Sequence, residues 1–161
     1  NDRSKYLAAY SRNVFAQDYM DEFVAIELTQ PLAKSIKKKR EAMEVVLKKY
    51  QQVMDYQVQE FSTQSTYKVA DVYSQMSKAV LESERPKGFS ELELEQYTLL
   101  LEEQAYPLEE TAIEIHETNV QNSWNGNYDR WVGKSIKALS KLLPGQYDKK
   151  ESLAGYSDVI Y

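Results

Sequence analysis

The stretch from Glu91 to Glu117, ELELEQYTLLLEEQAYPLEETAIEIHE, decides the fold of this chain. It carries nine glutamates and no lysine or arginine, and Pro107 divides it into two halves that each carry an apolar stripe. Short paired helices of this kind seldom bury their apolar faces alone, so they are typical of stacked helices, which mostly bind other proteins. We therefore expect an all-α protein in which this stretch supplies two helices.

The composition limits the class of protein. A length of 161 residues suits one domain, and 42% hydrophobic and 28% charged residues are typical of a globular one. No run approaches the roughly 18 apolar residues that cross a membrane, so we expect no direct membrane insertion. The net charge of −5 argues against nucleic-acid binding, because phosphate contacts need a surplus of lysine and arginine. The absence of cysteine excludes disulfides, thiolate metal sites and cysteine nucleophiles.

Apolar residues recur at intervals of three and four along most of the chain, which predicts about six helices. The expected helices span residues 4–27, 32–61, 66–83, 91–106, 107–124 and 128–143, and the third should be the most buried. We expect breaks at Thr29–Pro31, at Ser62–Ser65 and at the Asn125–Asn127 turn. Ser4 and Ser90 are the predicted caps of the first and fourth helices. Glu93 stands at the capping-box spacing from Ser90.

These helices are expected to form one domain over residues 1–145. An N-terminal helix pair would occupy residues 1–63, helical hairpins residues 64–145, and a flexible tail residues 146–161. Because the chain begins with Asn1 rather than methionine, we expect a fragment or a processed product of a longer protein.

Two segments resemble the helices of tetratricopeptide-repeat (TPR) proteins: VADVYSQMSKAVLESERPKG (69–88), a first helix leading into its turn, and YDRWVGKSIKALSKLLPGQY (128–147), a second helix closed by Pro144. The resemblance covers residues 67–147. Six helices in consecutive antiparallel pairs favour a helical bundle or an α-solenoid, and the resemblance implies an antiparallel stack of helix hairpins, that is, a TPR-like α-solenoid. We expect no cofactor.

The run from Glu82 to Glu117 is similar to a segment of large TPR proteins of Gram-negative bacteria, which are associated with TonB–ExbB–ExbD or gliding-motility envelope systems. This resemblance implies a non-enzymatic scaffold in the periplasm or cell envelope, of which the chain would be the C-terminal part. A cytoplasmic location stays open.

The acidic stretch is the candidate binding site. Glu110, Glu114 and Glu117 fall at i, i+4 and i+7, so they share one face of a helix. The residues that we expect to contact a protein or peptide partner, possibly a basic one, are Tyr97, Glu103, Tyr106, Glu110, Glu114 and Glu117. The simpler alternative is a solvated acidic face without a partner.

Metal and catalytic sites find little support in the sequence. A carboxylate-rich metal centre in a helical bundle uses Glu-x-x-His pairs, whereas no glutamate stands three residues before His116, the single histidine. Nucleophilic catalysis needs a base held by a third group, and His116 offers no such pattern in the sequence. We therefore assign no catalytic, metal or cofactor residues and expect a protein that is not an enzyme.

A basic run, Lys37–Arg40, lies in the expected second helix. It is either a solvated surface or a complement to the acidic helices, within the chain or between protomers. The competing hypothesis for function is a structural domain that forms a homo-oligomer through this long helix, with Met43 and Leu47 in the seam.

Overall fold

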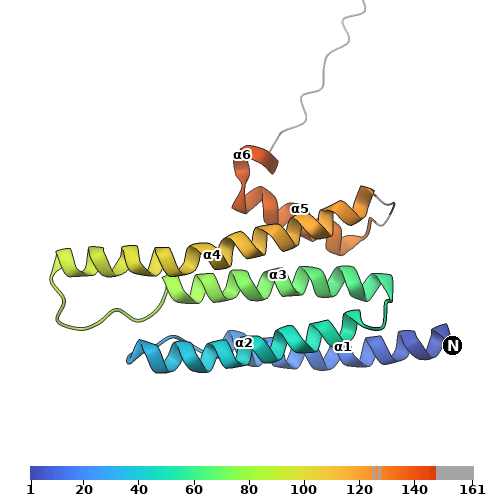
Figure 1. Cartoon of the computed structure of the whole chain (residues 1–161), viewed down its shortest axis with the longest axis horizontal. Coiled ribbons are helices and arrows are strands. Elements are labelled where there is room, and N and C mark those ends of the chain that lie inside the picture. Colours follow the sequence, from blue (N-terminus) through green and yellow to red (C-terminus); the bar gives the residue numbers. More distant parts are fainter. Residues whose placement is uncertain (125, 127, 148–161) are drawn as a thin grey trace, which may run out of the picture.

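Helices are the regular elements of the computed structural model, which describes residues 1–124, 126 and 128–147 (Figure 1). The elements are α1 (Asp2–Ala25), α2 (Leu32–Met54), α3 (Gln59–Leu81), α4 (Glu91–Trp124), α5 (Arg130–Leu142) and α6 (Pro144–Tyr147). No residue in the described ranges belongs to a strand, so the predicted all-α class is confirmed.

The helices are stacked in chain order. The α1–α2 pair forms one layer, α3 lies on that pair, and α4 lies on the opposite side of α3 (Figure 1). Helix α5 packs against α4 and also touches α3. Because α3 lies between them, α2 and α4 make no packing contact in the described part of the chain.

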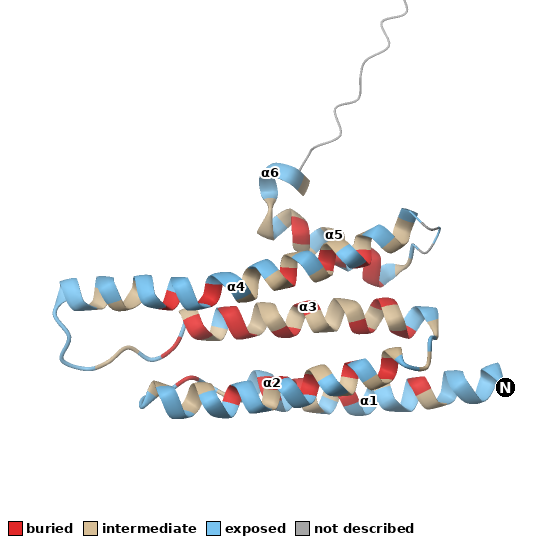
Figure 2. Ribbon diagram, viewed as in Figure 1, coloured by how far each residue is buried: buried red, intermediate tan, exposed pale blue. Residues whose placement is uncertain are grey.

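The main core lies between α1, α2 and α3 and extends to α4, which contributes Leu101 and Ala105 (Figure 2). Each helix contributes large side chains that are almost wholly buried, among them Phe23, Tyr50 and Met76. Helix α3 has neighbours on both sides, and nearly all of its residues are buried or partly buried. The expectation that the third helix is the most buried is therefore confirmed.

The expected break at Ser62–Ser65 is wrong. Helix α2 ends at Met54 and α3 begins at Gln59, so the four polar residues lie inside the first turns of α3. The Ser62 hydroxyl donates to the carbonyl of Val58 (3.1 Å), and Thr63 and Ser65 are buried. A hydroxyl that bonds back to a carbonyl of the preceding turn is compatible with a helix, so small polar residues do not by themselves mark a loop.

The expected division at Pro107 is also wrong, because α4 runs without interruption from Glu91 to Trp124 with Pro107 inside it. Proline removes one hydrogen bond of the helix and clashes with the preceding turn, which usually bends or ends it. Here the helix continues beyond the proline, where it packs between α3 and α5. The two expected helices are therefore a single helix. The number of described helices is still six because the structure contains the additional short helix α6.

The predictions for the helix ends are partly wrong and partly confirmed. Asn1, not Ser4, caps α1 by accepting from the amide of Arg3 (3.0 Å). The capping box is confirmed, since the Glu93 carboxylate accepts from the Ser90 amide (2.7 Å). In the predicted turn, Gly126 has a φ of +82°, while its neighbours lie outside the described residues. The predicted tail begins inside α6, and residues 148–161 likewise lie outside the described ranges.

Candidate docking surface on α4

Three of the six predicted contact residues line one pocket between α4 and the end of α5. Tyr106, Glu110 and Glu114 border a space of about 380 Å³. Leu142 and Leu143, at the end of α5, close it from the other side. The two remaining lining residues are Glu109 and Ile113. The pocket therefore joins an apolar wall to an acidic and aromatic rim.

The pocket residues are open to a partner. Tyr106, Glu110 and Glu114 are exposed, and they come from successive turns of a single helix. A hydrogen bond to the Glu110 carboxylate and the negative charge of that group raise the pKa of Tyr106. The phenol is therefore a neutral donor at neutral pH, beside carboxylates that accept.

Two further predicted residues lie on the same face. Glu103 is exposed about one turn before Tyr106. Glu117 is half-buried and accepts a hydrogen bond from the Tyr147 hydroxyl of α6 (3.1 Å). Positions 103, 106, 110, 114 and 117 fall within a narrow arc at 100° per residue. Helix α4 thus carries one continuous acidic face.

Tyr97 is not brought together with the others. It is partly buried and packs against the main core. Its ring makes an edge contact with Phe89 (5.9 Å between centroids), and the Arg85 guanidinium lies 6.0 Å from it. A separation of nine residues between Tyr97 and Tyr106 corresponds to half a turn beyond two full turns, so the two tyrosines face opposite sides of α4.

No cation neutralises the acidic face in the described part of the chain. The ion pairs found there are Lys78–Glu82 and Arg130–Glu60, and neither involves α4. The hypothesis of an internal match between the basic run and the acidic helices is wrong, because α2 and α4 lie on opposite sides of α3. Among the described residues, the glutamates of α4 thus form no ion pair.

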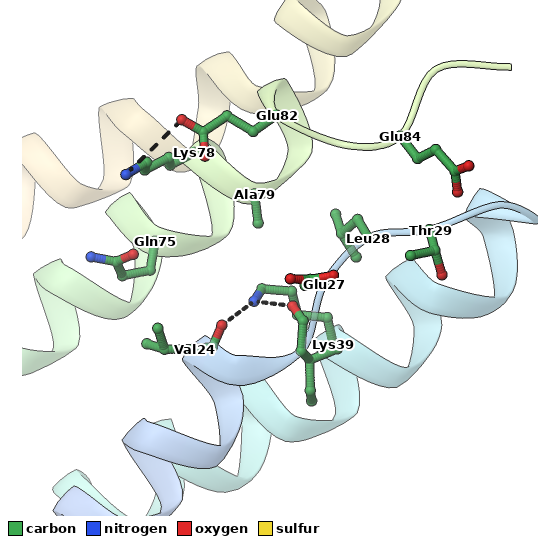
Figure 3. Close-up of a pocket in the computed structure, with 11 residues that line it drawn as sticks. Val24, Glu27, Leu28, Thr29, Lys39, Gln75, Lys78, Ala79, Glu82 and Glu84 are labelled. Carbon is green, nitrogen blue, oxygen red and sulfur yellow. Dashed lines mark hydrogen bonds and ion pairs between the residues drawn. The ribbon is translucent and has the colours of Figure 1, made fainter.

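One residue of the basic run has a different role that sequence analysis missed. Lys39 is only 2% exposed, and its ammonium donates to the carbonyls of Phe23 (2.9 Å) and Ile26 (2.6 Å) at the end of α1. Figure 3 shows its contact with the carbonyl of Val24 (3.5 Å). The last carbonyls of a helix lack partners within the helix and attract a cation. Burial lowers the pKa of Lys39. The residue thus joins α2 to the end of α1.

A larger pocket, of about 590 Å³, adjoins Lys39 (Figure 3). Several of its charged groups already have partners. Lys78 pairs with Glu82 at 4.0 Å, and the Glu84 carboxylate accepts from the Gln30 amide at 2.7 Å. The Gln30–Glu84 contact joins the α1–α2 loop to the segment after α3.

The predicted dimer seam of α2 lies inside the fold. Met43 is buried in the main core, and Leu47 packs against it. Val45 is the large apolar residue that α2 exposes in the described structure. Mutations at Met43 would therefore disturb the core rather than an interface.

His116 belongs to a buried polar network between α3, α4 and α5. Its Nδ1 lies 3.1 Å from the Ser135 hydroxyl, and the Asn119 amide donates to that hydroxyl (2.9 Å) and to the carbonyl of Thr63 (3.2 Å). Thr63 also donates to Asp129, whose carboxylate caps α5. Burial lowers the pKa of His116 to about 4. Ser135 is fully buried, so the His–Ser pair is inaccessible to a substrate.

Within the ranges that the structure describes, no group of three or more His, Cys, Asp or Glu residues is arranged to hold a metal ion. No helix among the described residues has both the length and the apolar character to span a membrane. Comparisons of the chain with protein-family models, curated proteins and solved structures gave no match.

Proposed function

We propose that this chain is a non-enzymatic scaffold that binds another protein through the acidic face of α4. The observation that carries the proposal is the pocket of Tyr106, Glu110 and Glu114 against Leu142 and Leu143. It combines apolar surface, a phenol donor and carboxylates without a cation, which suits a basic peptide segment. Because α4 is held by α3 and α5, the surface is formed before the partner arrives, which lowers the ordering cost of binding.

We further propose that the stack is TPR-like and works in a bacterial cell-envelope complex. The support is the resemblance of residues 67–147 to TPR helices and of residues 82–117 to large Gram-negative TPR proteins. The packing of each long helix on its neighbour in chain order is compatible with such a stack.

The test is recovery of a partner from an extract of the source cells with the immobilised chain. A triple variant, Glu103→Ala/Glu110→Ala/Glu114→Ala, removes the exposed carboxylates and leaves the Tyr147–Glu117 bond intact. The matched control, Asp18→Ala/Glu22→Ala/Glu41→Ala, removes three exposed carboxylates from α1 and α2. We expect the control to recover the same partner as the unmodified chain and the α4 variant to lose it. Equal recovery by both variants would contradict the proposal.

A further inference from the structure

A line of apolar side chains runs along the outer face of α4. Leu92, Leu99 and Tyr106 are 63%, 59% and 61% exposed, and Ile113 continues the line with partial exposure. The four residues are spaced by seven, that is, by two turns, so they form a nearly straight column with a slow drift around the helix. Apolar residues at every seventh position on a free helix face are typical of helices that pack against a second helix.

Nothing else in the described structure covers the first part of this column. The beginning of α4 projects past the end of α3 (Figure 1), and the exposed residues there include Leu100 as well as Leu92 and Leu99. A shallow pocket of about 700 Å³ lies beside the column, lined by Glu91, Leu94, Glu95, Thr98 and Leu99. The beginning of α4 is therefore one of the regions that expose large apolar side chains, and the beginning of α1, with Leu7 and Val14, is another.

Glutamates border the column on both sides. One row, three positions after the column residues, consists of Glu95, Glu102 and Glu109 and ends at the buried His116. The other row, four positions after, contains Gln96, Glu103, Glu110 and Glu117. Positions three and four residues on lie to the two sides of a column on a helix. The arrangement is thus one half of a helix pair, with an apolar seam and acidic flanks.

This arrangement selects among possible occupants. In a second copy, α4 against α4 would oppose glutamate to glutamate, and α2, which is basic, exposes Val45 as its large apolar residue. Helix α1 exposes a larger apolar surface, which includes Leu7 and Val14, but it carries four acidic and three basic residues and so does not complement the glutamate rows. Anionic lipid and nucleic acid would be repelled by the same carboxylates. A helix with its own apolar seam and with lysine or arginine on both sides matches the apolar column and the charged rows together.

We propose that the Leu92–Ile113 face of α4 binds a basic amphipathic helix of about 22 residues, roughly 32 Å long, from a partner protein. The inference rests on the proposed function and specifies its partner. The apolar column fixes the register of the partner helix, and the glutamate rows favour positively charged partners over others.

The experiment uses the whole chain and a labelled synthetic 22-residue peptide with leucine at heptad positions a and d and lysine or arginine at the flanking positions. Two control peptides are the scrambled sequence, which has the same charge, and a version with glutamate in place of every lysine and arginine. Binding is measured by fluorescence anisotropy at about 150 mM salt, where exposed charges are screened beyond roughly 8 Å. We expect the scrambled peptide to bind at least tenfold more weakly than the amphipathic one, and the acidic peptide not to bind.

The matched protein variants are Leu92→Ser/Leu99→Ser on α4 and Leu7→Ser/Val14→Ser on α1, where both side chains are also exposed. The α4 pair should weaken binding at least tenfold, and the α1 pair should leave it unchanged. Equal binding of the scrambled peptide, equal loss in both variants, or no binding of the amphipathic peptide would overturn the inference. So would self-association that sedimentation detects and that the α4 variant abolishes, because a second copy would then occupy the face.

The two proposals fail separately. If the cellular partner depends on Glu103, Glu110 and Glu114 but the amphipathic peptide does not bind, the docking function stands and the helical partner is wrong. If the peptide binds and no cellular partner depends on those glutamates, the face accepts such a helix but the proposed function has failed.

Discussion

The two halves of α4 differ in what they expose and bury. Before Pro107 the helix buries Leu101 and Ala105 but leaves Leu92, Leu99 and Leu100 exposed, whereas after it the helix buries the polar residues His116 and Asn119 (Figure 2). The cause is the neighbourhood, since the second half lies between α3 and α5 whereas the beginning of the first half projects beyond α3 (Figure 1). Polar groups enter the interior because Ser135 and the Thr63 carbonyl are there to bond them. The leucines exposed to water, by contrast, belong to the surface on which we propose that a partner helix binds.

The largest loss of stability is expected from a polar substitution in the buried half of α4, and a leucine substitution in the exposed half should cost less. Asn119→Ala removes bonds to the Thr63 carbonyl and to Ser135 and leaves a cavity, so we expect a loss of about 3 kcal/mol of unfolding free energy. Leu99→Ala, in the exposed half, should cost less than about 0.5 kcal/mol. Urea denaturation followed by circular dichroism measures both. A larger loss for Leu99→Ala would show that the first half is packed and not free.

The same contrast exists between neighbours in α2. Lys39→Met keeps the apolar stem but leaves the carbonyls of Phe23 and Ile26 without their donor, so we expect a loss of about 2 kcal/mol. Lys38→Met, at an exposed position, should change stability by less than about 0.5 kcal/mol. Thermal and urea unfolding compare the two variants, and equal stability would refute the role of Lys39 at the end of α1.

Sequence analysis correctly predicted the features that depend on residues close together in the chain. The class of the fold, the break before Pro31 and the Ser90–Glu93 cap all follow from periodicity and backbone preference. The end of α2 could not be predicted in this way, because the turn at Gln57, with a φ of +54°, contains neither glycine nor proline. The continuation of α4 through Pro107 depends on packing against α3 and α5, which no local pattern records.

The residues of the candidate site likewise include some that the sequence could predict and some that it could not. Helical spacing correctly grouped Glu110 and Glu114, because residues on one helix keep their angular relation wherever the helix lies. Tyr97 was misplaced although it lies with Tyr106 in the expected helix 91–106: a separation of nine residues puts the two on opposite sides of a helix, a relation that the sequence already contained. Leu142 and Leu143 could not be found from the sequence, since only the return of α5 brings them to the pocket.

The buried half of α4 should make stability depend on pH. Burial lowers the pKa of His116 from 6.5 to about 4, so the unfolded chain binds a proton at a higher pH than the folded chain does. Stability is therefore lost as the pH falls from about 6.5 towards 4, and by linkage the loss between pH 7 and pH 5 should be about 1–2 kcal/mol.

The measurement is the unfolding free energy at several pH values for the unmodified chain and for His116→Gln, which retains polar groups but does not titrate. The variant should lose the pH dependence between pH 7 and pH 5, whatever its stability at pH 7. An unchanged slope in the variant would assign the dependence to other groups and would contradict a neutral, buried His116.

The smallest expected change in unfolding free energy is on the acidic face of α4. There the same substitution should change stability and binding in opposite directions. Glu114 stands four residues after Glu110 and three before Glu117, without a cation in the described structure, so like charges repel along α4. Glu114→Gln should therefore raise the unfolding free energy by a few tenths of a kcal/mol, more at low salt than at high salt. The same substitution should weaken binding of the basic amphipathic peptide. If Glu114 lowers stability and improves binding, its presence is explained by binding, because stability alone would favour another residue at this position. A variant that is less stable and binds as well would remove that argument for Glu114.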